Sequence, residues 1–180
     1  TGGELFTLYL RELETGRDET LFERVIPGHV FAADARTVFA VELDDNHRPA
    51  RVLARRPGAK ARVVYEEADP GFFVSVGKTL SGRFIIVDAH DHQTSEVRLI
   101  DAHDPDVRPV LVAERIAEEE YDVAHNDEWL FIRTNRDARD FRIVRAPVDA
   151  PGRENWEDVV PHRPGVLIVG MAVFADYLVR

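Results

Sequence analysis

The chain has 180 residues, of which 44% are hydrophobic and 31% are charged, and it contains no cysteine. This is ample material for a buried core, but no run approaches the ~20 apolar residues that a membrane span needs. Without cysteine, no disulfide, thiolate metal site or thiol nucleophile can form, which fits a reducing cytoplasm. The net charge of −10 argues against nucleic acid partners and favours cationic ones, although an acidic surface can also serve solubility alone.

The first predicted element is a β-hairpin. Phe6, Leu8 and Leu10 alternate with other residues and so share one face of a half-buried strand. Gly16 lies in a polar turn, and a second strand begins at Thr20.

Longer units follow, each with four short strands separated by turn-forming residues. The second strand of each unit is the most apolar and the fourth the least, as expected if inner strands are buried and outer strands face water. We therefore predict that the core includes Phe39, Val41, Phe84, Ile86, Leu130 and Ile132. The expected strands are residues 30–33, 37–43, 51–55 and 62–67; then 72–78, 83–89, 95–102 and 109–114; then 121–125, 128–134, 141–147 and 156–161; a further unit opens at residue 166.

The same pattern recurs at almost constant intervals. The six-residue runs TLYLRE, RVLARR, EVRLID and FRIVRA begin at residues 7, 51, 96 and 141, which are 44, 45 and 45 residues apart. A period in the mid-forties made of short strands is typical of a β-propeller with one four-stranded antiparallel blade per repeat. We predict an all-β partial propeller with blade pieces at about residues 1–27, 28–70, 71–120, 121–165 and 166–180. The alternative is a small closed propeller with degenerate outer repeats.

Two motifs suggest ligands but fit poorly. Residues 71–79 resemble a phosphate loop, yet five residues separate Gly71 from Gly77 where four are needed, and the stretch reads as a strand. The clusters DAHDH at residues 88–92 and DAHD at 101–104 could supply metal ligands, with His90 and His92 on one strand face. Their position at strand ends favours solvated loop residues, so we assign no metal or cofactor site.

A nucleophile for catalysis is not evident. The serines are Ser75, Ser81 and Ser95, and none lies in a G-x-S-x-G turn. Ser81 is expected in a turn between strands. We therefore assign no catalytic residue and expect the chain alone to be inactive as an enzyme.

Several stretches together resemble one family. They are LFTLYLRELETG, VVYEEADPGFFVSVGKTLSGRFIIV, TSEVRLIDA, EYDVAHNDEWLFIRTN, FRIVRAPVD and ENWEDVVPHR. In this order they are similar to the propeller domain of the prolyl oligopeptidase family of serine peptidases, in particular its oligopeptidase B branch, over essentially the whole chain.

The resemblance implies a parent protein in which a seven-bladed propeller covers an α/β-hydrolase domain with a Ser-Asp-His triad that cleaves short peptides after Lys or Arg. This chain would be about four blades of that propeller, without the catalytic domain, and would act in the cytoplasm as a filter for substrate size. The partners would be the catalytic domain and short basic peptides, with no nucleic acid or membrane, and open blade edges could self-associate. A propeller used as a protein-interaction scaffold is the alternative, and a propeller enzyme with a site on its own axis is a third possibility.

Overall fold

The computed structural model describes residues 5–180, which form four antiparallel sheets. Each strand pairs with the strand that precedes or follows it in the sequence. The first sheet contains β1 (Phe6–Arg11), β2 (Asp18–Phe31), β3 (Val38–Leu43), β4 (Pro49–Arg55) and β5 (Arg62–Glu66); the second β6 (Phe73–Lys78), β7 (Phe84–His90), β8 (Ser95–Asp101) and β9 (Val110–Leu111); the third β10 (Tyr121–Asn126), β11 (Trp129–Thr134), β12 (Arg142–Pro147) and β13 (Glu157–Val160); and the last β14 (Ala172–Val173) and β15 (Leu178–Val179).

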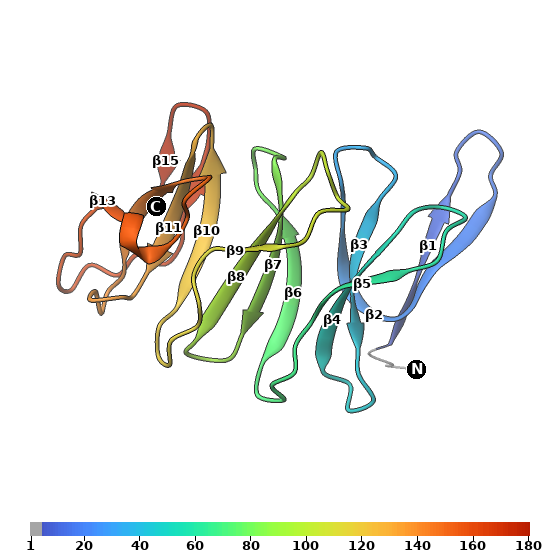
Figure 1. Cartoon of the computed structure of the whole chain (residues 1–180), viewed down its shortest axis with the longest axis horizontal. Coiled ribbons are helices and arrows are strands. Elements are labelled where there is room, and N and C mark those ends of the chain that lie inside the picture. Colours follow the sequence, from blue (N-terminus) through green and yellow to red (C-terminus); the bar gives the residue numbers. More distant parts are fainter. Residues whose placement is uncertain (1–4) are drawn as a thin grey trace.

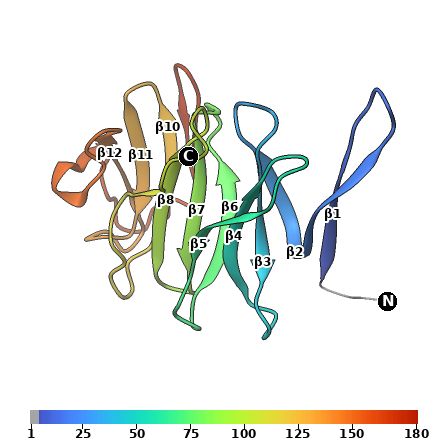
Figure 2. The same cartoon turned by 45° about the vertical axis from the view of Figure 1, so that its right-hand side comes forward.

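The sheets stand side by side in chain order, with their strands running up and down in the view of Figure 1. Turning the molecule by 45° shows the same succession, which does not close into a ring (Figure 2). This arrangement confirms the predicted all-β propeller blades. The helical structure within residues 5–180 is one 3₁₀ turn at Arg153–Asn155, and no helix in that range is long and apolar enough to cross a membrane.

The hairpin at the start of the chain is continuous with the next unit. The boundary expected between residues 27 and 28 falls inside β2, which pairs with β1 through its first half and with β3 through its second. The register shifts between Val25 and His29, where Gly28 has a φ of +110°. Glycine adopts this backbone conformation without the strain that a side chain would add, so β2 can bend there and serve two blade pieces.

The hydrophobic core lies between adjacent sheets. Strands near the centre of each sheet are therefore covered on both faces, and successive residues enter different core clusters. Phe39 and Val41 meet Ile85 and Val87 between the first and second sheets, while Val38 and Ala40 pack under the first hairpin. Between the second and third sheets, the core contains Phe84, Val97, Leu99, Leu130, Ile132 and Val144.

Five of the six predicted core residues are buried, but Ile86 is not fully so. Ile86 is half-buried at the margin of the cluster between the second and third sheets. The residue directly opposite it on β6 is Gly77, which has no side chain to cover it. The adjacent Ile85 points to the other face of β7 and is 0% exposed. The predicted strand is confirmed, but its most deeply buried isoleucine is Ile85 and not Ile86.

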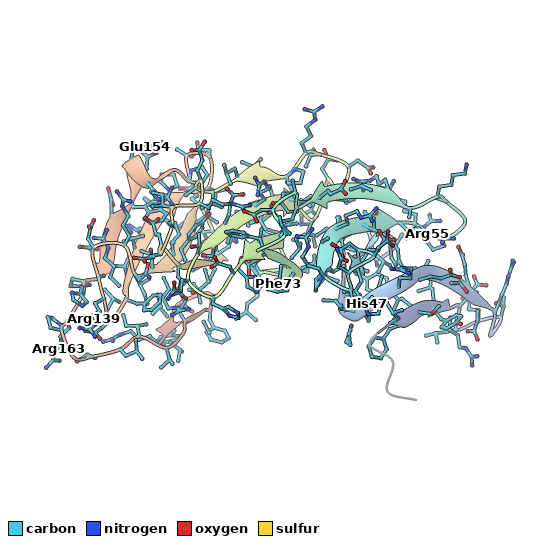
Figure 3. The ribbon with its side chains drawn as sticks, turned by 90° about the horizontal axis from the view of Figure 1, so that it is seen from below. His47, Arg55, Phe73, Arg139, Glu154 and Arg163 are labelled. Atoms are coloured by element: carbon cyan, nitrogen blue, oxygen red, sulfur yellow. The ribbon has the colours of Figure 1, made fainter. Side chains whose placement is uncertain are left out.

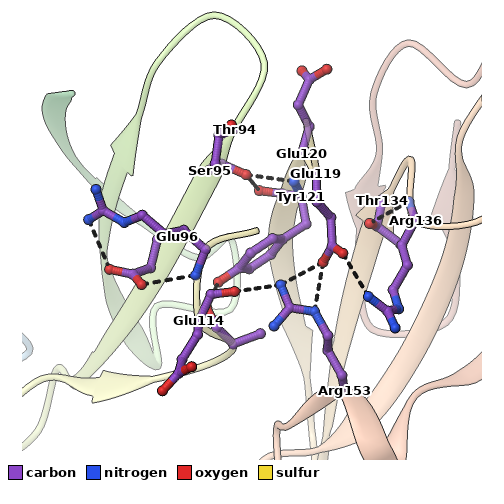
Figure 4. Close-up of polar contacts among 12 residues, drawn as sticks. Thr94, Ser95, Glu96, Glu114, Glu119, Glu120, Tyr121, Thr134, Arg136 and Arg153 are labelled. Carbon is purple, nitrogen blue, oxygen red and sulfur yellow. Dashed lines mark hydrogen bonds and ion pairs between the residues drawn. The ribbon is translucent and has the colours of Figure 1, made fainter. Parts of the chain in front are cut away.

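Buried carboxylates also join neighbouring sheets. Glu67, which follows β5, accepts a hydrogen bond from Arg115 at 2.6 Å, and the same guanidinium reaches Glu96 on β8 at 3.1 Å. Glu119 is bound from two sides, by Arg136 and Arg153, as Figure 4 shows. Because each carboxylate is paired and hydrogen-bonded, its burial is compensated.

Candidate functional site

Two surface pockets meet at His125, near the end of β10. The first has a volume of about 550 Å³ and lies between Arg83, before β7, and the β10–β11 hairpin. Its wall includes Trp129 and the carboxylate residues Asp127, Glu128 and Asp149. The second pocket, of about 220 Å³, is lined by Leu80, Ser81, His125, Asn126 and residues 173–175.

His125 joins two sheets through a hydrogen bond to Ser81. The Ser81 Oγ lies 2.8 Å from His125 Nδ1, and His125 Nε2 lies 2.7 Å from the backbone carbonyl of Asp127. Because a carbonyl only accepts, Nε2 carries the proton and Nδ1 accepts from the Ser81 hydroxyl. This is the tautomer that would be needed for His125 to act as a base toward Ser81.

The surroundings of His125 favour its neutral form. The residue is 6% exposed, and the ring of Phe84 meets the imidazole edge to face with centroids 4.9 Å apart. Burial lowers the pKa of His125 below its ordinary value of 6.5, and the positive charge of Arg83 acts in the same direction.

The arrangement around Ser81 differs from a serine triad in two respects. No carboxylate orients the imidazole, since Asp127 contributes its main-chain carbonyl. The Ser81 Oγ is also engaged by the Thr79 hydroxyl at 2.9 Å and by the Arg83 N–H at 3.3 Å. These contacts hold Ser81 within its turn, so the geometry fits a link between sheets better than a nucleophile.

The other two serines lie elsewhere. Ser95 is buried, donates to the carbonyl of Tyr121 at 2.8 Å and accepts from its N–H at 2.6 Å (Figure 4). Ser75 is on β6, directly opposite Asp88. None of the three serines belongs to a strand-to-helix elbow, because the residues around them are strands and turns.

The histidines of the sequence clusters at residues 88–92 and 101–104 do not come together in one site. His90 forms an ion pair with Asp88 at 2.9 Å, and this carboxylate raises the pKa of His90. His92 and His103 are exposed on turns. Within residues 5–180 no group of three or more histidine and acidic residues is arranged to hold a metal ion.

The stretch that resembled a phosphate loop is part of a strand. Lys78, which would hold a phosphate in such a loop, ends β6 and donates to the carbonyl of Phe31 at 2.9 Å. Its ammonium therefore joins the first and second sheets.

No local motif in the sequence marks His125 or links it to Ser81. The signal that could have joined them is the repeat itself, since the two residues are 44 positions apart, one repeat length. In an array of stacked blades, residues one period apart lie in neighbouring units.

The order of sheets, the blade period and the strand pairing together define a section of a propeller. The sequence profile described as the prolyl oligopeptidase N-terminal beta-propeller domain matches residues 1–180. The chain belongs to this family of propeller domains.

Individual relatives agree with this assignment. The chain is 35% identical over 191 residues to dipeptidyl aminopeptidase BI of Pseudoxanthomonas mexicana, and this match covers 99% of the chain and 25% of the relative. It is 29% identical to Protease 2 of Moraxella lacunata, covering 94% and 27%. The chain therefore spans about a quarter of the length of these relatives.

Solved structures show the same fold. The structure of oligopeptidase B from Leishmania major matches 97% of this chain and 25% of its own length, with a TM-score of 0.88 and 23% identity. Oligopeptidase B from Trypanosoma brucei, solved with covalently bound antipain in a closed form, matches 89% of this chain with a TM-score of 0.81 and 25% identity.

Proposed function

We propose that this chain is the gating, non-catalytic propeller part of a serine oligopeptidase that hydrolyses short peptides after Lys or Arg. The main support for this proposal is that the chain forms a section of stacked blades and matches the prolyl oligopeptidase propeller along its whole length. The absence of a triad arrangement around Ser75, Ser81 and Ser95 supports a role apart from bond cleavage.

Filtering by size would follow from geometry. A propeller above an active site leaves a narrow chamber, which an extended peptide can enter and a folded domain cannot. Such selectivity needs rigid walls. The buried core between sheets and the paired carboxylates at their seams supply rigidity of this kind.

Specificity for basic peptides is supported by charge. The net charge of −10 would raise the local concentration of cationic peptides through long-range attraction, which salt screens. The pocket beside Trp129, with Asp127, Glu128 and Asp149 in its wall, adds to this acidic character.

The proposed partner is a catalytic α/β-hydrolase domain, and the proposed compartment is the cytoplasm. Large apolar side chains are exposed near both ends of the stack, with Leu13 91% and Tyr9 62% exposed at one end and Val169 83% and Tyr177 75% exposed at the other. Patches of this kind mark contacts with further protein. We propose that further blades cover them, or a second copy when this chain is alone.

The test uses a protein in which this chain is joined to such a hydrolase domain. A short peptide containing one arginine should be cleaved, while the same sequence placed in a loop of a stably folded domain should not. Unfolding that domain by mutation should restore cleavage, which controls for access to the arginine. Equal rates on the free peptide and on the folded domain would contradict gating.

A further inference from the structure

An arginine-rich stretch stands out in this acidic chain. Residues 48–62 contain six cationic residues and no acidic one, although acidic residues outnumber cationic ones by ten over the whole chain. The cationic residues are Arg48, Arg51, Arg55, Arg56, Lys60 and Arg62. The stretch forms β4, the turn after it and the start of β5.

The second sheet contributes further arginines beside this stretch. A pocket of about 400 Å³ lies between β5 and residues 106–109, and its wall includes Arg62, Arg98 and Arg108. A smaller pocket of about 90 Å³ adjoins it and shares Arg62 and Asp106. We refer to the cationic residues around both pockets as the basic rim, which consists of Arg55, Arg56, Lys60, Arg62, Arg98 and Arg108.

Positive charge on the basic rim is only partly neutralised. Asp106 is shared between Arg56 at 2.8 Å and Arg62 at 3.3 Å. Arg56 also reaches Asp34 at 3.5 Å, and Arg98 pairs with Glu96 at 2.6 Å. Lys60 and Arg108 are exposed and form no ion pair with the residues that the structure describes. Arg55 pairs with Glu19 at 2.8 Å. The six cations of the rim thus face four carboxylates, Glu19, Asp34, Glu96 and Asp106, which leaves an excess of two positive charges.

Apolar side chains and a free strand edge lie beside these charges. Val63 is 53% exposed, Val107 38% and Val110 57%. Within the described sheets β5 pairs with β4 alone, so its other edge offers backbone groups without a strand partner. An extended segment can add to such an edge through main-chain hydrogen bonds, while its side chains contact the neighbouring surface.

We propose that the basic rim is a docking surface for an extended, carboxylate-rich segment of another protein. Glutamate or aspartate side chains would pair with Arg62 and Arg108, whose planar guanidinium groups suit carboxylates. Apolar side chains of the segment would cover Val63 and Val107. The acidic remainder of the chain would repel such a segment elsewhere and so confine it to the rim. This surface is separate from the proposed gating function and does not depend on it.

The test measures binding of a fluorescein-labelled ten-residue peptide of alternating glutamate and valine by fluorescence anisotropy. The chain should bind this peptide in spite of its net charge, and added salt should weaken the complex. The double variant K60E/R108E should lose about tenfold or more in affinity, since rim charges steer and hold a charged partner. Neither residue forms an ion pair within residues 5–180, so the variant is expected to fold.

The matched control is R139E/R163E, which changes the net charge by the same amount on two exposed arginines. Figure 3 shows Arg139 and Arg163 at the end of the molecule opposite to Arg55, which ends β4. This control should bind like the parent chain. The proposal is overturned if the peptide does not bind, if both double variants weaken it equally, or if a single-stranded oligonucleotide binds the rim more tightly than the peptide does.

Discussion

Arg153 and Glu119 form a buried ion pair beside the seam between the second and third sheets. Arg153 Nε donates to Glu119 Oε1 at 2.7 Å, and its Nη2 donates to the carbonyl of Glu114 at 2.6 Å (Figure 4). Glu114 follows β9, whereas Arg153 follows β12. One guanidinium therefore connects the outer ends of two neighbouring sheets.

Removing this arginine should weaken the seam. The Glu119 side chain is 6% exposed and that of Arg153 17%, and a buried carboxylate that loses a partner keeps its desolvation cost. We expect Arg153→Met to lower the free energy of unfolding by about 2 kcal/mol, because Arg136 remains as a partner of Glu119. A urea melt measures this. As a control, Arg11→Met breaks the exposed pair with Asp18 and should leave the free energy of unfolding nearly unchanged, because solvent screens an exposed ion pair. Equal effects would show that burial at the seam contributes nothing.

The two isoleucines of β7 should respond differently to truncation. Ile85 is 0% exposed, so Ile85→Ala should cost ~2–5 kcal/mol of unfolding free energy. Ile86 faces Gly77 and is half-buried, and its replacement should cost roughly half as much. Chemical denaturation of both variants checks the order. A larger loss for Ile86→Ala would mean that the faces of β7 are assigned the wrong way round.

His125 should make the chain less stable in mild acid. Because burial lowers its pKa in the folded chain, the unfolded chain binds a proton first as the pH falls below 6.5. The free energy of unfolding should therefore decrease from pH 6.5 down to the lower folded pKa. His90 acts in the opposite sense, since Asp88 raises its pKa, so the comparison must be between the parent chain and His125→Gln. The variant should show a smaller loss of stability over this interval, and an unchanged loss would contradict burial of a neutral His125.

Association through the ends of the stack is also expected for the isolated chain. Tyr9 and Leu13 near one end and Val169 and Tyr177 near the other expose apolar surface that another copy can cover. Light scattering should report a dimer or larger assembly at micromolar concentrations. Replacing Tyr9 and Val169 by lysine should shift the population towards the monomer of 20.4 kDa. A parent chain that stays monomeric at high concentration would contradict this expectation.

Much of the fold could be predicted because hydrophobic alternation and turn residues act over a few positions. The repeat then indicated that the units stack, and the buried Phe39, Leu130 and Ile132 follow from both signals. The prediction for Ile86 is wrong because β7 is covered on both faces, so alternation alone does not show which of Ile85 and Ile86 is buried more deeply.

The polar contacts were harder to predict. The pair of Ser81 and His125 depends on a turn of one repeat and the end of a strand of the next approaching within 2.8 Å, and no local pattern encodes such a distance. The Arg115 contacts with Glu67 and Glu96 are of the same kind, since they join residues from different strands and sheets.

The most direct test of the account is peptidase activity of the purified chain itself. Incubation with an arginyl or lysyl amide substrate should release nothing above buffer, and a fluorophosphonate probe should not label Ser81, because no carboxylate orients His125 and the Ser81 hydroxyl is held in its turn. Turnover that persists after further purification, is blocked by the probe and disappears in Ser81→Ala would contradict a non-catalytic propeller.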